Sequence, residues 1–185
     1  MAPVAHLLFS WLTTVKLVKN RRERALVSSA GVLPDIDGIG LVVDWITDKT
    51  NYYAMYHHYI GHSIYSALLI STLLVLLSKT QRKLVFLLSF FLVHFHIFLD
   101  IIGSKGPDGN QWPVYYLYPV DSSFNITWSG QWELNAWQNQ LFMLVLLIFS
   151  IYIAVTRKLT FLEIFSEKLN QEVFSMYNRY VSKRH

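Results

Sequence analysis

Long apolar stretches constrain the fold of this chain more than any other feature. Four stretches are almost wholly apolar: Leu7 to Val18, Ser63 to Leu77, Leu84 to Ile102 and Leu141 to Val155. The longest contains only His94, His96 and Asp100 as titratable groups. At a helical rise of about 1.5 Å per residue it is long enough to cross the hydrocarbon core of a bilayer.

These stretches predict an all-α fold, a polytopic membrane helical bundle with about four to five membrane-inserted helices. Hydrophobic residues make up 53% of the chain, more than a soluble domain of this length usually contains. A soluble helical protein with long core helices is the alternative, but the uncharged stretches argue against it. The chain has no cysteine, which excludes disulfides and zinc–thiolate sites.

The second membrane helix is expected to be interrupted. Glycine and proline residues break the stretch from Ala25 to Ile46, and such irregular backbone is tolerated at membrane depth where it is buried or lines a wet cavity. Apolar residues between Lys158 and Arg184 recur at a helical spacing among charges of both signs, which predicts a C-terminal amphipathic helix. We therefore expect a membrane-embedded domain over residues 1–156 and a cytoplasmic amphipathic tail over residues 157–185.

Basic residues suggest how the chain is oriented. They follow Val18 and Val155 and lie between Leu77 and Leu84, whereas residues 47–61 and 103–140 each carry a single lysine. The positive-inside rule then places the N-terminus and both of these segments outside and the tail inside. We expect an integral protein of a bacterial or archaeal cell membrane, with no removed signal peptide. The net charge of +4 gives no reason to expect a nucleic-acid partner, because the basic residues cluster at the ends of the apolar stretches.

The long outer segment, residues 103–140, is rich in aromatic residues, including Trp112, Trp128 and Trp137. Such rings commonly settle at the membrane–water interface, so an interfacial belt is the preferred interpretation. The alternative is a lid that covers a lipid-like substrate.

Histidine and aspartate residues lie within the apolar stretches or at their ends, where an ionisable group is costly. Seven are candidate ligands of a metal ion: His6, Asp35, Asp37, His57, His62, His96 and Asp100. By the predicted topology they lie in one layer near the outer side of the membrane. Imidazole and carboxylate are ligands that zinc prefers. A single catalytic zinc takes three protein ligands, so seven candidates favour two ions that share a bridging carboxylate.

Each element of this set also has a purely structural interpretation. His96 and Asp100 are four residues apart and share a helix face, where they can bind a metal or simply hydrogen-bond to each other. Asp35 and Asp37 can be turn residues, although two close carboxylates repel unless a cation lies between them. His57 and His62 converge only if His57 precedes the helix that begins near His62.

Three neighbouring residues complete this set of expectations. Ser63 is expected to cap the helix that follows it. His58 is expected to point away from His57. His94 is on a different helix face from His96 and is interpreted as a packing residue.

The ordered motifs resemble those of the membrane-bound metal-dependent hydrolase family (YdjM-like, also labelled inner-membrane LexA-binding hydrolases). Leu33-Pro34-Asp35-Ile36-Asp37 matches its second motif, His57 with His62-Ser63 its third, and His96 with Asp100 its fourth. The family in turn is similar to the zinc-dependent phospholipase C and P1 nuclease group.

The resemblance implies hydrolysis by a metal-activated water, with Asp35, Asp37 and His62 at the catalytic step. It also implies zinc as the metal, with Mn²⁺ and Mg²⁺ left open, and as substrate a phosphoester of a membrane lipid or lipid-linked molecule. Two positions depart from or only loosely match the family pattern. His58 replaces an arginine, and serines follow Asp121 where basic residues are usual. Both departures remove groups that could hold an anionic substrate. His58 and Asp121 are themselves weak candidates for contact with the substrate or with a metal ligand.

Two further functions stay open. A metal transporter needs polar groups through to the inner side, and the inner halves of 63–78 and 141–156 offer few. A non-catalytic scaffold would use the His–Asp pairs only to lock helices together.

Overall fold

The computed structural model describes residues 1–106 and 108–182. Within these residues the chain is helical, and Val114 and Ile126 form one isolated β-bridge. The elements are α1 (Pro3–Leu17), α2 (Arg21–Ser29), η1 (Leu33–Ile39), α3 (Gly40–Thr47), α4 (Tyr52–Tyr56), α5 (Ile64–Leu77), α6 (Arg82–Gly103), α7 (Trp137–Arg157), η2 (Phe161–Ile164) and α8 (Glu167–Ser182), where η denotes a 3₁₀ helix. The predicted all-α class is confirmed.

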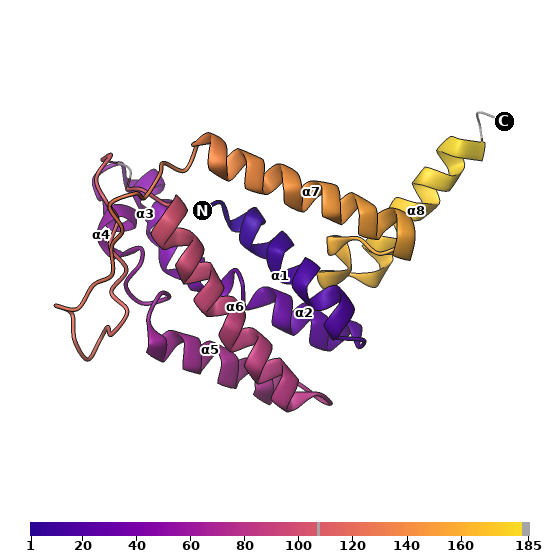
Figure 1. Ribbon diagram of the computed structural model, residues 1–185, viewed down its shortest axis with the longest axis horizontal. Coiled ribbons are helices and arrows are strands. Elements are labelled where there is room, and N and C mark those ends of the chain that lie inside the picture. The colour runs from indigo at the N-terminus through magenta and orange to yellow at the C-terminus, as the bar shows by residue number, and fades with distance from the viewer. Residues whose placement is uncertain (107, 183–185) are drawn as a thin grey trace.

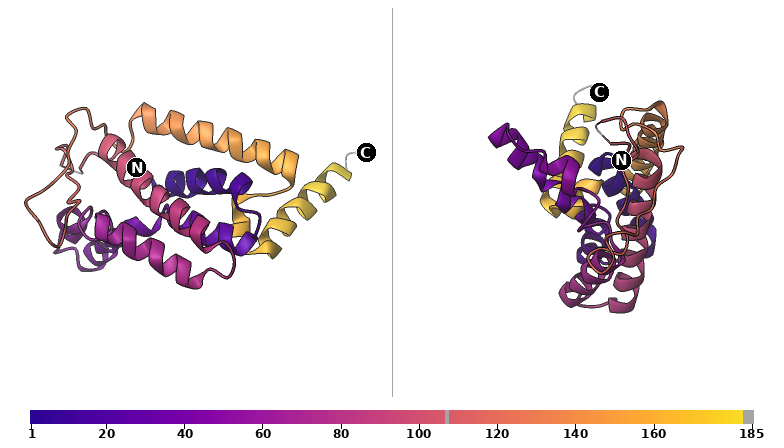
Figure 2. Two further views of the ribbon diagram at one scale, coloured as in Figure 1. Left: turned by 60° about the horizontal axis from the view of Figure 1, so that its bottom comes forward. Right: turned by 90° about the vertical axis from the view of Figure 1, so that its left-hand side faces the viewer.

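Helix α1 lies at the centre of the bundle, packed against α2, α6 and α7 (Figure 1). Helices α5 and α6 form an antiparallel pair on the side of α1 away from α7, while α3, α4 and the long loop gather at one end (Figures 1 and 2). Buried apolar side chains of α2, α5 and α6, among them Val27, Leu74 and Leu92, form the largest core cluster. Each of these three helices therefore buries an apolar face against the other two.

Two helices, α6 and α7, are long and apolar enough to cross a membrane. The stretch from Arg21 to Thr47 counts as a third span if its two halves, which meet at an angle of 47°, are taken together. The break lies at 30–32, between α2 and η1, which confirms the expected interruption of the second helix. Helix α5 is apolar but only 14 residues long, so a count of four to five inserted helices stays a prediction.

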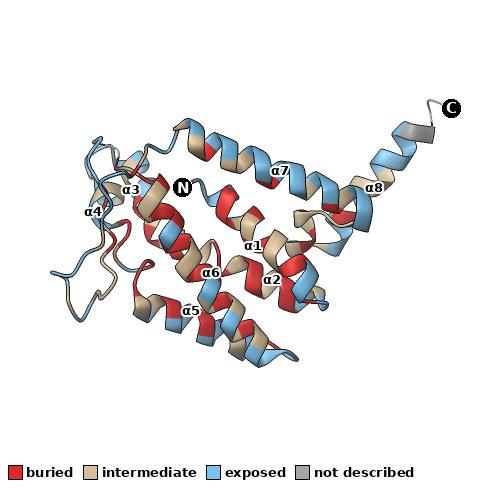
Figure 3. Ribbon diagram, viewed as in Figure 1, coloured by how far each residue is buried: buried red, intermediate tan, exposed pale blue. Residues whose placement is uncertain are grey.

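Helix α7 exposes most of its apolar surface. Only 17% of its most apolar window is buried, and Figure 3 shows the helix largely in the colour of exposed residues. Leu144, Ile148, Ile151 and Val155 are each more than half exposed. In water such a surface would be unfavourable, whereas hydrocarbon solvates it, as the sequence predicts for a membrane helix.

Side-chain caps fix where two helices begin. The side chain of Asn20 accepts hydrogen bonds from the backbone of Arg22 and Glu23 at the start of α2. Ser63 Oγ accepts one from Ser66 N at 3.1 Å at the start of α5, which confirms the predicted cap. The Ser63 cap places His62 just before the first turn of α5.

Glu23 ties α2 to the turn between α5 and α6. Its side chain is fully buried, and one carboxylate oxygen accepts hydrogen bonds from Lys79 N at 2.8 Å and Thr80 N at 3.0 Å. The carboxylate therefore satisfies backbone donors that the turn would otherwise leave without partners.

The tail differs from the single amphipathic helix expected from Lys158. Lys158 has a left-handed backbone (φ 55°) and ends α7, η2 then packs against the bundle, and α8 begins at Glu167. The physical reason is Glu163, which is 1% exposed and pairs with Arg24. Helix α8 points away from the bundle with Leu169 and Tyr177 exposed (Figure 1). Lys183 and Arg184 of the predicted helix lie outside the described residues.

Candidate metal centre

Four side chains from three separate segments bring one ligand atom each to a common point. These atoms, from Asp35 in η1, His62 before α5, and His96 and Asp100 in α6, all lie within 4.8 Å of one another. His96 Nε2 lies 3.1 Å from His62 Nε2, 3.0 Å from Asp100 Oδ2 and 3.5 Å from Asp35 Oδ1. The predicted convergence of these residues is therefore present in the fold.

The orientation of His96 is set by a backbone carbonyl. Its Nδ1 lies 2.8 Å from the oxygen of Gly31, and because a carbonyl only accepts, Nδ1 carries the proton. In the neutral ring Nε2 then offers a lone pair to the cluster. This is the arrangement by which metal-binding histidines are commonly oriented.

Asp37 orients the other histidines rather than joining the group of four. Its two oxygens lie 2.7 Å from His57 Nδ1 and 3.0 Å from His62 Nδ1, and the second also accepts a hydrogen bond from Gly61 N. With Nδ1 of His62 donating to this carboxylate, Nε2 of the neutral ring is left as an acceptor. It lies 3.3 Å from Asp100 Oδ2.

The donor set fits a tetrahedral zinc ion. Metal–ligand bonds of about 2.0–2.2 Å place tetrahedral ligands about 3.3–3.6 Å apart. The separations are 3.0 to 3.3 Å among His62, His96 and Asp100 and 3.5 Å from His96 to Asp35, and all four ligand atoms lie within 4.8 Å of one another. Two imidazole lone pairs and two carboxylates at such distances repel one another unless a cation lies between them.

His6 extends the cluster on the other side of Asp100. It is 1% exposed, and neither ring nitrogen makes a hydrogen bond with the described residues, although Nε2 lies 3.4 Å from Asp100 Oδ1. The positively charged amino group of Met1 contacts the same oxygen. Asp100 thus faces two histidines through Oδ2, and one histidine and a cation through Oδ1. A carboxylate in this position can bridge two positive charges.

The expectation that His58 points away from its neighbours is wrong. Its backbone is left-handed (φ 73°), which turns the side chain inward, and its ring lies 4.4 Å from that of His57 and 4.5 Å from that of His62. Burial holds the pKa of His58 well below its usual value, so the ring is neutral at pH 7. Each of the three histidines offers one atom to a second group that can hold an ion.

His62 is also where a proton competes with a metal. Burial opposes its charged form, but hydrogen bonds to Asp100 and Asp37 outweigh burial and raise the pKa of His62 to about 9. A metal that binds here at neutral pH must therefore displace a proton.

Part of the aromatic loop covers the histidines. Trp112 is 6% exposed and lies 4.8 Å from the ring of His57 and 4.6 Å from that of His58. Gln131 links this tryptophan to the cluster: its amide accepts from Trp112 N and donates to the carbonyl of Asp100 at 3.0 Å. Trp128 and Trp137 are exposed, as an interfacial belt requires. The loop therefore covers the histidines at Trp112, whereas Trp128 and Trp137 face outward.

Asp121 and His94 are placed away from these contacts. Asp121 accepts hydrogen bonds from Ser123, which lower the pKa of its carboxyl, and from Phe124 N. These bonds close a local turn, and a contact with substrate stays a prediction. His94 hydrogen-bonds to Phe90 O and to the hydroxyl of Tyr116, which confirms it as a packing residue.

Several groups that contact the cluster could not be predicted from the sequence. The carbonyl of Gly31 and the amino group of Met1 are backbone groups, which residue types do not reveal. Gln131 is one polar residue in a polar loop. Trp112 belongs to the aromatic residues of segment 103–140, but its packing on the histidines depends on the path of the loop.

Gly61 allows the two motifs to approach. A Cβ at this position would lie 1.9 Å from the carbonyl oxygen of Pro34. We expect Gly61→Ala to push residues 34–37 away from residues 57–62 and to destabilise the fold by about 1–3 kcal/mol, the usual range for overpacking. Metal affinity should fall although no ligand is removed. Thermal unfolding and metal titration of the variant would check this, and unchanged values in both would contradict the close packing.

Comparison with known proteins adds one finding. The model of the family described as YdjM inner membrane protein matches residues 1–161. This range includes every residue of the cluster and ends within η2. No curated protein and no solved structure matches the chain.

Proposed function

This chain belongs to the YdjM inner membrane protein family. From the geometry of its buried histidine and aspartate cluster we propose that it is a metal-dependent hydrolase embedded in the membrane. The cluster binds a divalent ion, with zinc as the first candidate and Mn²⁺ or Mg²⁺ as alternatives. A second ion would be held by the other group, His57, His58 and His62. The substrate is a phosphoester of a lipid or lipid-linked molecule, reached from the outer side. A relation to the phospholipase C and P1 nuclease group stays a prediction.

One observation carries the proposal: His62, His96 and Asp100 bring three ligand atoms to 3.0–3.3 Å from one another in a buried site, with Asp35 beside them. A scaffold that only locks helices needs His–Asp pairs. Here His62 and His96 also bring their Nε2 atoms within 3.1 Å of each other beside Asp100, where a metal ion would displace the proton that His62 carries at neutral pH. Orienting bonds from Asp37 and Gly31 on the far nitrogens match the usual surroundings of metal-binding histidines.

A zinc ion held by His62, His96 and Asp100 would keep its fourth position for a water, whose pKa it would lower to about 7, and could polarise a phosphoryl oxygen. The chain supplies the remaining groups. Asp35 Oδ2 is buried without a hydrogen-bond partner among the described residues, so it is available to accept a proton from the attacking water. Asp35, Tyr53, His57 and Ser104 line a cavity of about 380 Å³. His57, oriented by Asp37, is positioned to give a proton to the leaving oxygen.

Asp37→Asn tests the orienting role. An amide offers one acceptor oxygen in place of two, so either His57 or His62 loses its partner. We expect metal affinity to fall about 10–100-fold, the usual effect of removing such a partner, with helicity retained. Asp48→Asn is the matched control, because Asp48 is exposed and its left-handed backbone suits asparagine. Metal titration by a competing chelator measures both, and equal affinities would contradict the role.

The function is tested with purified protein in lipid nanodiscs, by elemental analysis and by mass spectrometry of the lipids after metal loading. Zinc bound to the protein together with release of a phosphorylated head group supports the hydrolase. Metal that crosses proteoliposomes without lipid cleavage would favour the transporter. No bound metal after reloading would leave the helix-locking scaffold.

A further inference from the structure

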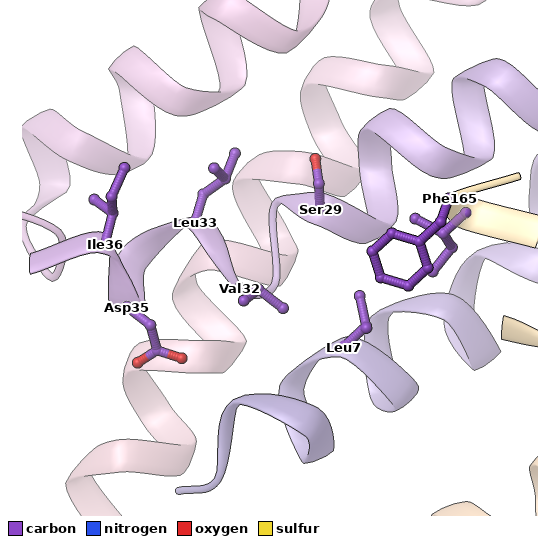
Figure 4. Close-up of a pocket in the computed structure, with 8 residues that line it drawn as sticks. Leu7, Ser29, Val32, Leu33, Asp35, Ile36 and Phe165 are labelled. Carbon is purple, nitrogen blue, oxygen red and sulfur yellow. The ribbon is translucent and has the colours of Figure 1, made fainter. Parts of the chain in front are cut away.

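Asp35 lies in the wall of two cavities with different linings. One, of about 420 Å³, is apolar apart from Asp35 and Ser29, and is formed by α1, α2, η1 and η2 (Figure 4). In Figure 4 Ile36 and Asp35 lie toward one end of the labelled side chains and Phe165 lies at the other. The other cavity, of about 380 Å³, contains the polar groups of Tyr53, His57 and Ser104.

The apolar cavity offers almost nothing to a polar ligand. Ser29 Oγ already donates to Leu26 O at 2.7 Å. The free polar atom of the lining is Asp35 Oδ2, which has no hydrogen-bond partner in the described residues. A polar molecule would lose its hydrogen bonds with water in this cavity and recover few of them, whereas a hydrocarbon chain loses none.

The rim of the cavity is itself apolar and exposed. Ile36 is 64% exposed and Phe165 63% exposed. In an inner membrane protein, apolar surface of this kind faces hydrocarbon, so a chain can enter from the bilayer without crossing water.

A third cavity, of about 470 Å³, shares Ile36 with the first and is lined by apolar residues including Val43. It adjoins Asp37 rather than Asp35. Both oxygens of Asp37 are engaged, by His57, His62 and Gly61. This cavity therefore lacks a free carboxylate oxygen of the cluster and serves as a control.

We propose that the substrate is an amphiphile whose apolar chain lies in the cavity of Figure 4 and whose polar head lies among Tyr53, His57 and Ser104, with the ester phosphate beside Asp35. This inference rests on the proposed function and deepens it. It assigns the chain-binding surface to Leu7, Val32, Leu33, Ile36, Ile164 and Phe165. The substrate class is thus a phosphoester with a single chain held separately from its head group.

The test compares Val32→Trp, which fills the apolar cavity, with Val43→Trp, which places the same ring in the control cavity. The probe is lysophosphatidylethanolamine with a photoreactive diazirine in its single acyl chain, incorporated into nanodiscs with the zinc-loaded protein. Peptide mapping should find the crosslink in wild type on residues 32–36 and 164–165. Val32→Trp should reduce this crosslink at least fivefold, and Val43→Trp should leave it unchanged.

A second readout separates chain binding from chemistry. Both variants are assayed on the phospholipid and on bis(p-nitrophenyl) phosphate, which has no apolar chain. Val32→Trp should lower the ratio of lipid turnover to soluble turnover at least tenfold, and Val43→Trp should leave the ratio unchanged. Circular dichroism and metal content show whether each variant folds. If Val32→Trp does not fold, Phe165→Asp at the exposed rim replaces it, because a charge there hinders entry of the chain.

The possible results distinguish the proposed hydrolase activity from the proposed lipid-binding cavity. No hydrolysis of either substrate by wild type, with the crosslink still in the cavity, would overturn the hydrolase but leave the lipid site. Hydrolysis with a crosslink spread evenly over α7, or unaffected by Val32→Trp, would overturn the lipid site. Equal losses on both substrates would also count against it.

Discussion

Replacing His96 with alanine should remove the metal while the helices persist. His96 Nε2 lies within 3.5 Å of ligand atoms from all three partners, so its loss removes the atom common to the set. Losing an orienting partner of a ligand usually costs about 10–100-fold in affinity, and losing the ligand itself should cost more than about 100-fold. We expect hydrolysis to fall below detection. Chelator competition, elemental analysis and circular dichroism would measure the effect.

His94→Ala is the matched control for this variant. It changes the same residue type two positions away on α6, where the ring contacts Phe90 and Tyr116. The variant should lose about 1–3 kcal/mol of stability because its two hydrogen bonds are removed, and it should keep the metal. Equal metal loss in both variants would mean that alanine at either position disturbs α6. Metal retained in His96→Ala would exclude this cluster as the site.

Replacing Glu163 with alanine should give the largest loss of stability in the chain. The carboxylate is buried, lies 2.5 Å from Arg24 Nη2 and accepts a hydrogen bond from Trp11 Nε1 at 2.9 Å. Its removal leaves a buried guanidinium without its counter-charge, and breaking such a pair costs about 3–5 kcal/mol. The free energy of unfolding in detergent, measured by chemical denaturation, tests this.

Glu172→Ala serves as the reference. Glu172 is 53% exposed and lies 3.9 Å from Lys168, an exposed pair of a kind that contributes about 0–1 kcal/mol. A loss of unfolding free energy in Glu163→Ala no larger than in Glu172→Ala would contradict a stabilising role of the buried Glu163–Arg24 pair. Loss of α8 alone, with the rest of the bundle intact, would show that Glu163 secures only the tail.

Much of the centre could be predicted from local patterns. Spacing of four put His96 and Asp100 on one face of α6, and glycine and proline marked the break that carries Asp35. That the clusters meet in one layer of the bundle followed from where the apolar stretches begin and end. These features depend on short-range geometry, which residue type and spacing determine.

Roles within the centre depend on contacts that spacing does not reveal. Asp35 and Asp37 look equivalent in the sequence, yet Asp37 faces two Nδ1 atoms and Asp35 faces the cluster. His58 turned inward because its backbone is left-handed, a conformation uncommon outside glycine. The tail was mispredicted for a similar reason, since helical periodicity treats Glu163 as a surface charge and takes no account of Arg24.

The ligands of the centre come from segments that leave the ribosome at different times. Asp35 and His62 are synthesised well before Asp100, so the site cannot be complete until α6 has entered the bilayer beside η1. A cation captured there would join the earliest helices to a later one and disfavour release of α6 into the lipid. Metal supply would then influence the yield of correctly inserted protein during biogenesis.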